Sequence, residues 1–221
     1  MDIEKTKYNG IYFLFGEKRK ILLTKSLDDK SYFGEKLFDG YREFIPNRSK
    51  LAASIIKGIS LMPIKENDVV LYLGAAQGQT ATYVSDIVGK NGFVFCVELS
   101  PRAARNLVYV CEQRENMTAI LADANHPEIY KDNITKADII YQDIAQKNQV
   151  EIFLKNIDLF LNPKGYALIA LKTRSIDVTK NPKSIFQDVR KELEKKLKII
   201  DVKDLNPFQK DHYFFVCQKR T

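Results

Sequence analysis

From Ser49 to the last residue, short apolar segments alternate with longer segments of helical periodicity. Continuous apolar runs such as residues 68–73 and 165–171 are typical of strands that are covered on both faces. The segments between them carry apolar residues every three or four positions, which predicts helices. A chain in which strands and helices alternate forms a mostly parallel sheet with helices on both faces.

This alternation predicts a Rossmann-like α/β fold built on a seven-stranded sheet. Strands are expected at residues 68–73, 92–97, 118–121, 137–142, 165–171, 198–204 and 213–218, and helices at 50–59, 79–88, 101–114, 150–161 and 183–196. Ser49 or Asn47 is a candidate cap of the first helix, and Asn162 with Pro163 should end the fourth. Only a short loop separates the last two strands, so we expect them to form an antiparallel pair at the edge of the sheet, with an antiparallel C-terminal strand.

The first 46 residues follow a different pattern. Residues 10–15 and 20–24 are β-rich runs separated by Gly16-Glu17-Lys18-Arg19, which predicts a hairpin. The sequence therefore predicts a small N-terminal β-rich unit at 1–46 and a second domain at 47–221. Aromatic residues recur among polar ones in the first unit, and they could form its core or contact a partner: Tyr32, Phe33, Phe38, Tyr41 and Phe44.

Composition excludes several classes of protein. A hydrophobic content of 45% with a mean hydropathy of −0.28 indicates a soluble globular chain, and no apolar run is long enough to span a bilayer. The first residues lack the apolar stretch of a signal peptide, so we expect a cytoplasmic protein.

The three cysteines, Cys96, Cys111 and Cys217, are widely spaced and are expected to be buried free thiols. With two histidines and no Cys-x-x-Cys, no metal site is predicted.

The net charge of +7 is distributed unevenly along the chain. Residues 1–66 carry 13 basic and 9 acidic side chains, residues 67–146 carry 6 and 10, and residues 147–221 carry 16 and 9. An acidic middle segment therefore lies between two basic ends. This distribution suits a protein that contacts a polyanion and separately binds a cationic small molecule.

The turn after the first predicted strand of the α/β part is built from small residues. In a sheet of this kind, ligands bind beyond the carboxyl ends of the strands, and here the sequence is Gly74-Ala75-Ala76-Gln77-Gly78-Gln79-Thr80. Gly74 and Gly78 could let a ligand approach the backbone. The spacing is neither the Gly-x-Gly-x-x-Gly of dinucleotide sites nor a P-loop, which disfavours a nicotinamide-dependent dehydrogenase.

Polar residues stand at the ends of the following strands. Glu98 could accept hydrogen bonds from both hydroxyls of a ribose, and Asp123 lies where an adenine amino group could be recognised. Asp143 and Lys172 follow the next two strands. An adenosine ligand without phosphates and with a cationic centre fits this set of residues, and S-adenosylmethionine is such a ligand.

Seven short segments, in this order, are shared with a known family: residues 48–53 (RSKLAA), 70–76 (VLYLGAA), 84–89 (VSDIVG), 97–98 (VE), 123–127 (DANHP), 143–146 (DIAQ) and 211–212 (DH). Through them the chain resembles fibrillarin, in particular the archaeal fibrillarin-like rRNA/tRNA 2′-O-methyltransferases. The resemblance runs from about Tyr8 to the last residue. It implies an S-adenosylmethionine-dependent methyltransferase fold for residues 47–221.

The resemblance also implies which residues bind S-adenosylmethionine. Gln79 stands where the family usually has Thr, and Leu99 stands where it usually has Phe. Leu99 could still pack on the adenine, although without aromatic stacking. With the turn residues included, the expected cofactor-binding set is Gly74, Ala75, Gln79, Thr80, Glu98, Leu99, Asp123, Ala124, Asp143, Ile144, Ala145 and Gln146.

The family's catalytic group is centred on a lysine, and the matching residues are Lys50, Asp143, Lys172 and His212. We expect Lys172 to be closest to the 2′-hydroxyl and Asp143 to orient it. Lys50 would make Lys172 easier to deprotonate or would steady the ribose and phosphate. His212 would hold the substrate or complete the hydrogen-bond network.

The resemblance further implies a catalytic subunit of a box C/D guide ribonucleoprotein. Its expected partners are the guide RNA, the rRNA or tRNA substrate, a Nop-family scaffold protein and a kink-turn-binding protein of ribosomal type, with no membrane contact. We expect the archaeal form, which lacks the Gly/Arg-rich N-terminal tail of the eukaryotic proteins. Two alternatives stay open, namely a protein methyltransferase with the same cofactor pocket and a non-catalytic subunit of an RNA particle.

Overall fold

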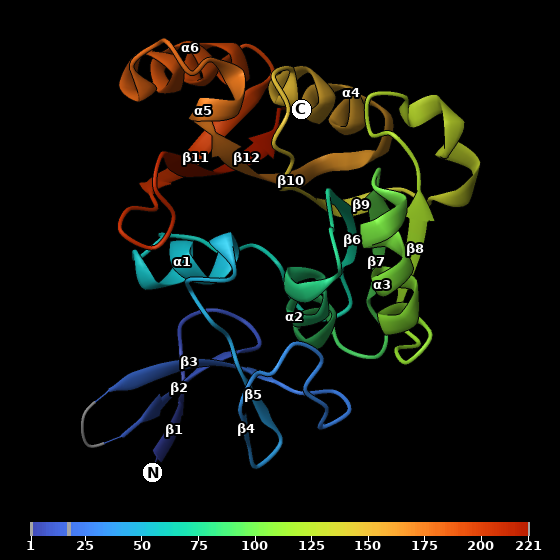
Figure 1. Ribbon diagram of the computed structural model, residues 1–221, viewed down its shortest axis with the longest axis vertical. Coiled ribbons are helices and arrows are strands. Elements are labelled where there is room, and N and C mark those ends of the chain that lie inside the picture. The colour runs from blue at the N-terminus through green and yellow to red at the C-terminus, as the bar shows by residue number, and fades with distance from the viewer. Residues whose placement is uncertain (1, 17–18, 221) are drawn as a thin grey trace.

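A small sheet and a large sheet make up the computed structural model, which describes residues 2–16 and 19–220. In Figure 1 the small N-terminal sheet lies below the large sheet, with α1 (Lys50–Ile56) and α2 (Gln79–Val88) between them. The small sheet has the order β1-β2-β3-β5-β4 and is antiparallel throughout. Its strands are β1 (Asp2–Lys5), β2 (Ile11–Phe15), β3 (Lys20–Lys25), β4 (Leu37–Phe38) and β5 (Tyr41–Glu43).

The predicted N-terminal hairpin is confirmed. Strands β2 and β3 pair in antiparallel register from Ile11 opposite Thr24 to Phe15 opposite Lys20. Residues 17 and 18 of the predicted turn lie outside the described part of the chain. The sequence did not predict β1, β4 and β5, because strands of two to four residues are too short to show a period of two.

The large sheet has the order β11-β12-β10-β9-β6-β7-β8, and the predicted mostly parallel, seven-stranded sheet is confirmed. Strand β12 runs antiparallel to both of its neighbours, β10 and β11, so the last two strands form the predicted antiparallel pair and β11 lies at the edge. The strands are β6 (Val69–Leu73), β7 (Phe93–Glu98), β8 (Met117–Leu121), β9 (Ala137–Gln142), β10 (Leu161–Lys172), β11 (Leu197–Asp204) and β12 (His212–Lys219).

The helices follow the predicted order with corrected ends. Helix α1 ends at Ile56 rather than at residue 59, because the chain turns at Gly58 with a φ of +72°. The prediction that α4 ends before Asn162 and Pro163 is confirmed, since the helix ends at Phe160; both residues lie at the start of β10, where the register with β9 shifts. The other helices are α3 (Pro101–Cys111), α4 (Gln149–Phe160), α5 (Thr173–Ile176) and α6 (Pro182–Glu194), with short 3₁₀ turns at Pro127–Ile129 and Lys131–Asn133.

Both faces of the large sheet are covered, as the continuous apolar strands predicted. Alternate residues of β6 face opposite sides: Val70 and Tyr72 pack with α1, α2 and α3, while Leu71 and Leu73 pack with α4 and α6. The cluster on the first side also includes residues of the small sheet, such as Leu22. The carboxyl ends of β6 to β10 are thereby left as the open edge of the sheet, where ligands bind in this class of fold.

A buried group of charges joins the small sheet to α2. Arg42 of β5 is fully buried, and its Nη2 lies 2.6 Å from Asp86 Oδ2 on α2. Asp86 Oδ1 also forms an ion pair with Arg114, which follows α3, at 2.7 Å from Nη2. The small sheet is therefore tied to the larger part by charges as well as by apolar packing. The division into domains at 1–46 and 47–221 remains a prediction.

The three cysteines are free thiols. Cys96 and Cys217 are buried as predicted, and burial raises the pKa of Cys217 to about 12. The prediction is wrong for Cys111, which is partly exposed because it is the last residue of α3. Within residues 2–16 and 19–220, no helix has the length and apolar character that crossing a bilayer requires, and no group of three His, Cys, Asp or Glu side chains is arranged to hold a metal ion.

Candidate active site

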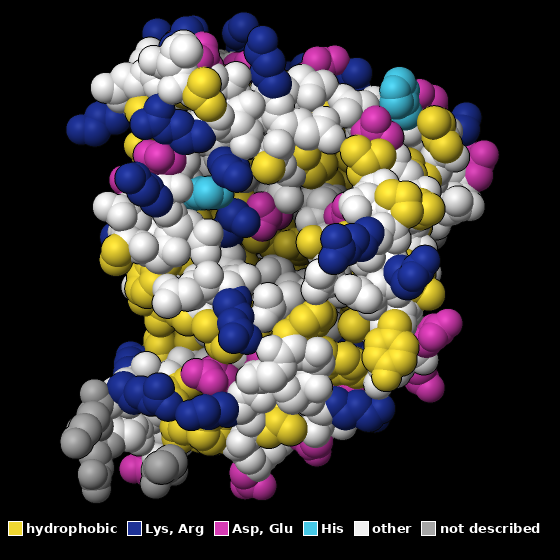
Figure 2. Space-filling view, viewed as in Figure 1, with side chains coloured by type: hydrophobic (Ala, Val, Ile, Leu, Met, Phe, Trp, Pro, Cys, Tyr) yellow, Lys and Arg dark blue, Asp and Glu magenta, His cyan; other side chains and the backbone are white. Residues whose placement is uncertain are grey.

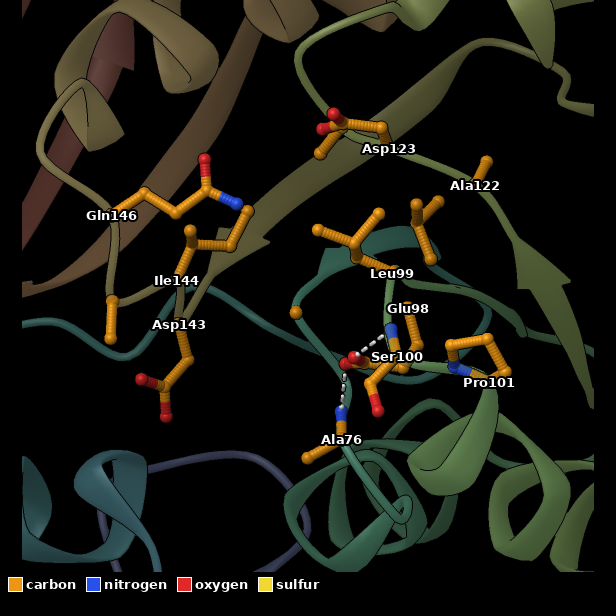
Figure 3. A pocket seen from close by; sticks show the side chains of 14 residues that line it. Ala76, Glu98, Leu99, Ser100, Pro101, Ala122, Asp123, Asp143, Ile144 and Gln146 are labelled. Carbon is orange, nitrogen blue, oxygen red and sulfur yellow. Dashed lines mark hydrogen bonds between the residues drawn. The ribbon is translucent and has the colours of Figure 1, made fainter.

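A cavity of about 530 Å³ lies beyond the carboxyl ends of β6, β7, β8 and β9. Its lining includes nine of the twelve predicted cofactor-binding residues and five further residues (Figure 3). The predicted ones are Gly74, Glu98, Leu99, Asp123, Ala124, Asp143, Ile144, Ala145 and Gln146, and the further ones are Ala76, Val97, Ser100, Pro101 and Ala122. The sequence located the cavity through the strand ends and missed small residues beside them that carry no distinctive side chain.

The backbone of Gly74 presses against the loop that follows β9. Gly74 has a φ of +78°, and a Cβ at this position would lie 2.6 Å from the Asp143 carbonyl oxygen and 2.8 Å from Ile144 Cγ1. Any side chain here would push the Asp143 loop out of place. Glycine is required at position 78 for a different reason, since a Cβ there would lie 2.9 Å from Leu107 Cδ1 of α3. Gly78 serves the packing of α2 against α3 and does not line the cavity, so the expectation that it lets a ligand approach the backbone stays a prediction.

Glu98 holds the two loops at one end of the cavity. Its Oε2 accepts a 2.8 Å hydrogen bond from the Ala76 amide, and its Oε1 accepts one of 2.8 Å from the Ser100 amide, as the dashed lines in Figure 3 show. An ionised carboxylate has about four acceptor positions, so roughly two of them remain for hydroxyl donors of a ligand.

Asp123 and Gln146 are linked across the other end of the cavity by Asn125. Asp123 Oδ1 accepts from the Asn125 amide at 2.9 Å and from its Nδ2 at 3.0 Å, and the same Nδ2 donates to Gln146 Oε1 at 3.0 Å. The backbone hydrogen bond from Asn125, with the weaker help of its side chain, lowers the pKa of Asp123 below the usual value. Asp123 is thus a charged acceptor at neutral pH. Asn125 was not among the predicted site residues, although an Asp-x-Asn turn signals this local bonding.

Apolar side chains stand between these two polar ends. Leu99 and Ile144 project into the middle of the cavity from the loops after β7 and β9 (Figure 3). Half of the Leu99 surface is exposed, so this side chain offers apolar surface to a ligand in the cavity.

Three predicted cofactor-binding residues do not line the cavity. Thr80 is buried, and its Oγ1 donates a 3.1 Å hydrogen bond to Ser49 Oγ, the side chain that caps α1. Ala75 is also buried, and Gln79 is the half-buried first residue of α2. Their contact with a cofactor stays a prediction.

The predicted catalytic residues meet beside the cavity. Lys50 is the first residue of α1, and its Nζ lies 2.8 Å from Asp143 Oδ2, with about one fifth of each side chain exposed. We expected Asp143 to orient Lys172. Within the described residues, Asp143 instead forms its ion pair with Lys50. Asp143 belongs to the cavity lining as well, so it connects the two parts of the site.

Lys172 and His212 lie next to each other on the neighbouring strands β10 and β12. Lys172 is the last residue of β10 and His212 the first of β12, and their Cα atoms are register partners. His212 is nearly buried, and its Nδ1 lies 2.7 Å from the Lys210 carbonyl oxygen. A carbonyl can only accept, so Nδ1 carries the hydrogen and Nε2 of the neutral ring is left as an acceptor.

Burial is the main reason that the pKa of His212 lies below its usual value. The hydrogen bond to Lys210 and the charge of Asp143 oppose this shift, whereas the charges of Lys50 and Lys172 reinforce it. His212 is therefore neutral at pH 7. Figure 2 draws one face of the molecule, and basic, acidic and histidine side chains gather there at one side of a central hollow.

The family model "Fibrillarin" matches residues 3–221. The fibrillarin-like rRNA/tRNA 2′-O-methyltransferase of Methanocaldococcus jannaschii is 46% identical over 219 residues, which cover 96% of this chain and 95% of the relative. These matches span nearly the whole chain, including both sheets.

Two solved structures have the same fold. The fibrillarin of a fibrillarin/Nop5p complex superposes with a TM-score of 0.91 at 42% identity, covering 97% of this chain and all of that one. The Aeropyrum pernix fibrillarin, in complex with natively bound S-adenosyl-L-methionine, superposes with a TM-score of 0.91 at 38% identity, covering 98% of each chain. The sequence resemblance is thereby confirmed, and the chain belongs to the fibrillarin family.

Proposed function

We propose that this protein is an S-adenosylmethionine-dependent RNA 2′-O-ribose methyltransferase, the catalytic subunit of a box C/D guide ribonucleoprotein that modifies rRNA and tRNA. The observation that carries the proposal is the position of Asp143, which lines the cavity and also forms the ion pair with Lys50. One carboxylate thus joins an adenosine-sized pocket to a cluster of proton-transfer groups. The named activity of the 46% identical relative is the same.

The residues of the cavity fit S-adenosylmethionine. Glu98 has acceptor positions left for the ribose hydroxyls, and Asp123 can accept from the adenine amino group. Leu99 and Ile144 offer apolar surface for the adenine ring. Asp143 supplies negative charge for a cationic sulfonium. When bound, S-adenosylmethionine supplies an electrophilic methyl group.

The residues beside the cavity would handle the acceptor hydroxyl. A ribose 2′-hydroxyl becomes a good nucleophile only as its proton leaves, and Lys172 is the side chain we place closest to that oxygen. His212 is neutral with Nε2 as acceptor, so it can take a hydrogen bond from the ribose or from the Lys172 ammonium. Holding the hydroxyl in line would supply much of the rate enhancement.

Lys50 and Asp143 would act on this arrangement as a pair. The ammonium of Lys50 holds the Asp143 carboxylate in position at the mouth of the cavity. The same positive charge lies close enough to His212 to oppose its protonation. Lys50 therefore also favours an unprotonated acceptor beside the 2′-hydroxyl.

The partners follow from the family. A Nop-family protein is the scaffold partner, as for the fibrillarin solved with Nop5p. The guide RNA would select the nucleotide, and a kink-turn-binding protein would complete the particle. The basic ends of the chain would contact backbone phosphates without recognising sequence. We also propose that the protein works in the cytoplasm.

Reconstitution with a guide RNA, both protein partners and labelled S-adenosylmethionine tests the function, followed by mapping of the modified ribose. We expect one methylated 2′-hydroxyl opposite the guide, and loss of the label with Lys172→Ala or Asp143→Ala. Label on a protein component would support a protein methyltransferase, and a particle that forms without label would support a non-catalytic subunit. Wild-type turnover in either variant would refute the assigned roles.

A further inference from the structure

Strand β10 extends beyond its neighbour β9 at the active-site edge. The pairing of β9 with β10 ends where Ile169 lies opposite Gln142, the last residue of β9. Strand β10 continues for three more residues to Lys172. On its other side it stays paired with β12 up to Lys172 and His212. The main chain of Lys172 therefore has a strand neighbour on the β12 side and none on the β9 side.

The side chain of Gln149 occupies the missing strand position. Gln149 is the first residue of α4 and is fully buried. Its Oε1 accepts a 3.0 Å hydrogen bond from the Lys172 amide, and its Nε2 donates a 3.1 Å hydrogen bond to the Lys172 carbonyl. A primary amide carries a donor and an acceptor side by side, so it can pair with both polar groups of one residue as a neighbouring strand does.

The second hydrogen of the same amide reaches the cofactor side. Gln149 Nε2 also donates to the Gln146 carbonyl at 2.9 Å, and Gln146 lines the cavity. The main chain of Gln149 is held in turn, since its carbonyl accepts a 2.6 Å hydrogen bond from Nε2 of the fully buried Gln142. One connected set of hydrogen bonds thus runs from the end of β9 to the cofactor loop, residues 143–146, and to Lys172.

We propose that Gln149 is a positioning residue for methyl transfer, which sets the main chain of Lys172 relative to the cofactor loop. This inference rests on the proposed function. Lys172 carries its ammonium on a flexible stem, so the accuracy of its position depends on how well its main chain is fixed. A misplacement of about 1 Å can lower a reaction rate about 100-fold. Gln149 touches neither substrate nor cofactor in this assignment and acts only through Lys172 and Gln146.

Gln149→Leu tests the proposal, because leucine fills similar space and makes none of these hydrogen bonds. In the cofactor-free protein, amide hydrogen exchange followed by NMR should show that the Lys172 amide loses at least tenfold protection. In the reconstituted particle, kcat should fall at least tenfold while KM for RNA and Kd for S-adenosylmethionine change less than about threefold. A purely structural residue would lower the melting temperature without this split between kcat and the binding constants.

The matched control is Asn116→Leu. Asn116 is also buried, and its amide also donates to two backbone carbonyls, those of Ser85 and Gly89, but it lies on the α2 side of the sheet. The Asn116→Leu variant should lower the melting temperature about as much as Gln149→Leu does. It should leave both kcat and the exchange of the Lys172 amide unchanged.

Gln149→Glu is the second variant, in case the leucine variant does not fold. Its carboxylate can still accept from the Lys172 amide but cannot donate to either carbonyl, and one bound proton restores a donor to one of the two. Its kcat relative to wild type should therefore rise as the pH is lowered from 8 to 6, whereas the Asn116→Leu ratio should stay flat.

The possible failures are distinguishable. An inactive wild-type particle would refute the proposed function, and the exchange measurement would still decide the role of Gln149. An active wild type with unchanged kcat in Gln149→Leu, or a Lys172 amide that stays protected in it, would overturn the inference. So would a Gln149→Glu ratio that does not depend on pH.

Discussion

The ammonium of Lys50 lies 2.8 Å from Oδ2 of Asp143, although 93 residues separate them in the chain. Lys50 starts the helix that precedes the large sheet, and Asp143 follows the fourth strand of that sheet in the chain. The pair joins α1 to the carboxyl edge of the sheet at the mouth of the cavity. Its removal should therefore affect catalysis more than folding.

Lys50→Met should lower guide-directed methylation about 100-fold, because Asp143 loses its partner and the proton acceptor loses a neighbouring charge. The free energy of unfolding should change by less than about 1 kcal/mol, since the pair is partly exposed. Single-turnover methylation and urea unfolding measure the two effects. Lys155→Met, which removes the exposed pair with Glu151, is the control and should leave the rate unchanged. A methylation rate in Lys50→Met equal to that of the control would contradict the prediction.

Gly74→Ala should destabilise the protein by about 3 kcal/mol, because a left-handed backbone costs about 1–2 kcal/mol for alanine and the Cβ also displaces the Asp143 carbonyl. Affinity for S-adenosylmethionine should fall with it. Gly58→Ala separates the two causes: Gly58 has a similar φ of +72° with open space around it. It should cost about 1–2 kcal/mol and leave the affinity unchanged, as chemical unfolding and calorimetry can show. Equal effects of the two variants would rule out a close-contact role for Gly74.

Glu98→Gln should weaken S-adenosylmethionine binding about 10- to 100-fold, the range expected when a charged acceptor becomes neutral at about 1.5–3 kcal/mol. The new amide hydrogens would also point at the Ala76 or Ser100 amide, which is itself a donor. Isothermal titration calorimetry measures the change. Glu194→Gln on α6, which removes a charge from an exposed ion pair, should bind as wild type does. Unchanged affinity in Glu98→Gln would show that Glu98 serves only the two loops.

His212 should make the protein less stable as the pH falls. The pKa of His212 in the folded protein lies below its unfolded value of about 6.5, so the unfolded chain binds more protons in acid. This contribution to stability is present above about pH 6.5 and is lost as the pH falls through the folded pKa, at no more than about 1.4 kcal/mol per pH unit. His212→Asn keeps a donor for the Lys210 carbonyl and cannot titrate. Denaturant unfolding from pH 7.5 to 5 should show a shallower decline for the variant, and an equally steep decline would refute the prediction.

Arg42→Met should lower the free energy of unfolding by about 3–5 kcal/mol, because it leaves Asp86 and Glu35 with less buried positive charge. Adding Asp86→Asn should recover part of this loss, although Arg114 then keeps only the ion pair with Asp28. Chemical unfolding followed by far-UV circular dichroism measures both. Arg190→Met, which breaks the exposed pair with Glu194, should cost less than about 1 kcal/mol. A loss in Arg42→Met as small as that of the control would show that the buried charges contribute little.

The cofactor side of the site was largely predictable from the sequence. Parallel strands end at one edge of a sheet, so Glu98, Asp123 and Asp143 could be placed together once their strands were identified. The choice of partner within the site was not predictable. Whether Asp143 pairs with Lys50 or Lys172 depends on how α1 crosses the sheet, which no local pattern encodes.

The positioning of Lys172 was missed for a related reason. Gln149 is uncharged and its side chain contacts a residue 23 positions away, so neither charge nor periodicity marks it. Three strands of the small sheet were missed because each is too short for a period of two to be recognised. The sequence predicts best what repeats along the chain, and least what depends on one long-range contact.

The reversed direction of β12 brings the first residue of a strand to an edge where the other strands end. His212 therefore reaches the acceptor side from a hairpin that contributes nothing to the lining of the cofactor cavity. The loop before it is attached to the chain on both sides of α1, through Lys57 to the Asn206 carbonyl and through Gln209 to the Asn47 carbonyl. Substitutions in residues 204–212 would thus change the surroundings of His212 while the lining of the methyl-donor pocket stays intact, so the two parts of the site can be altered separately in design.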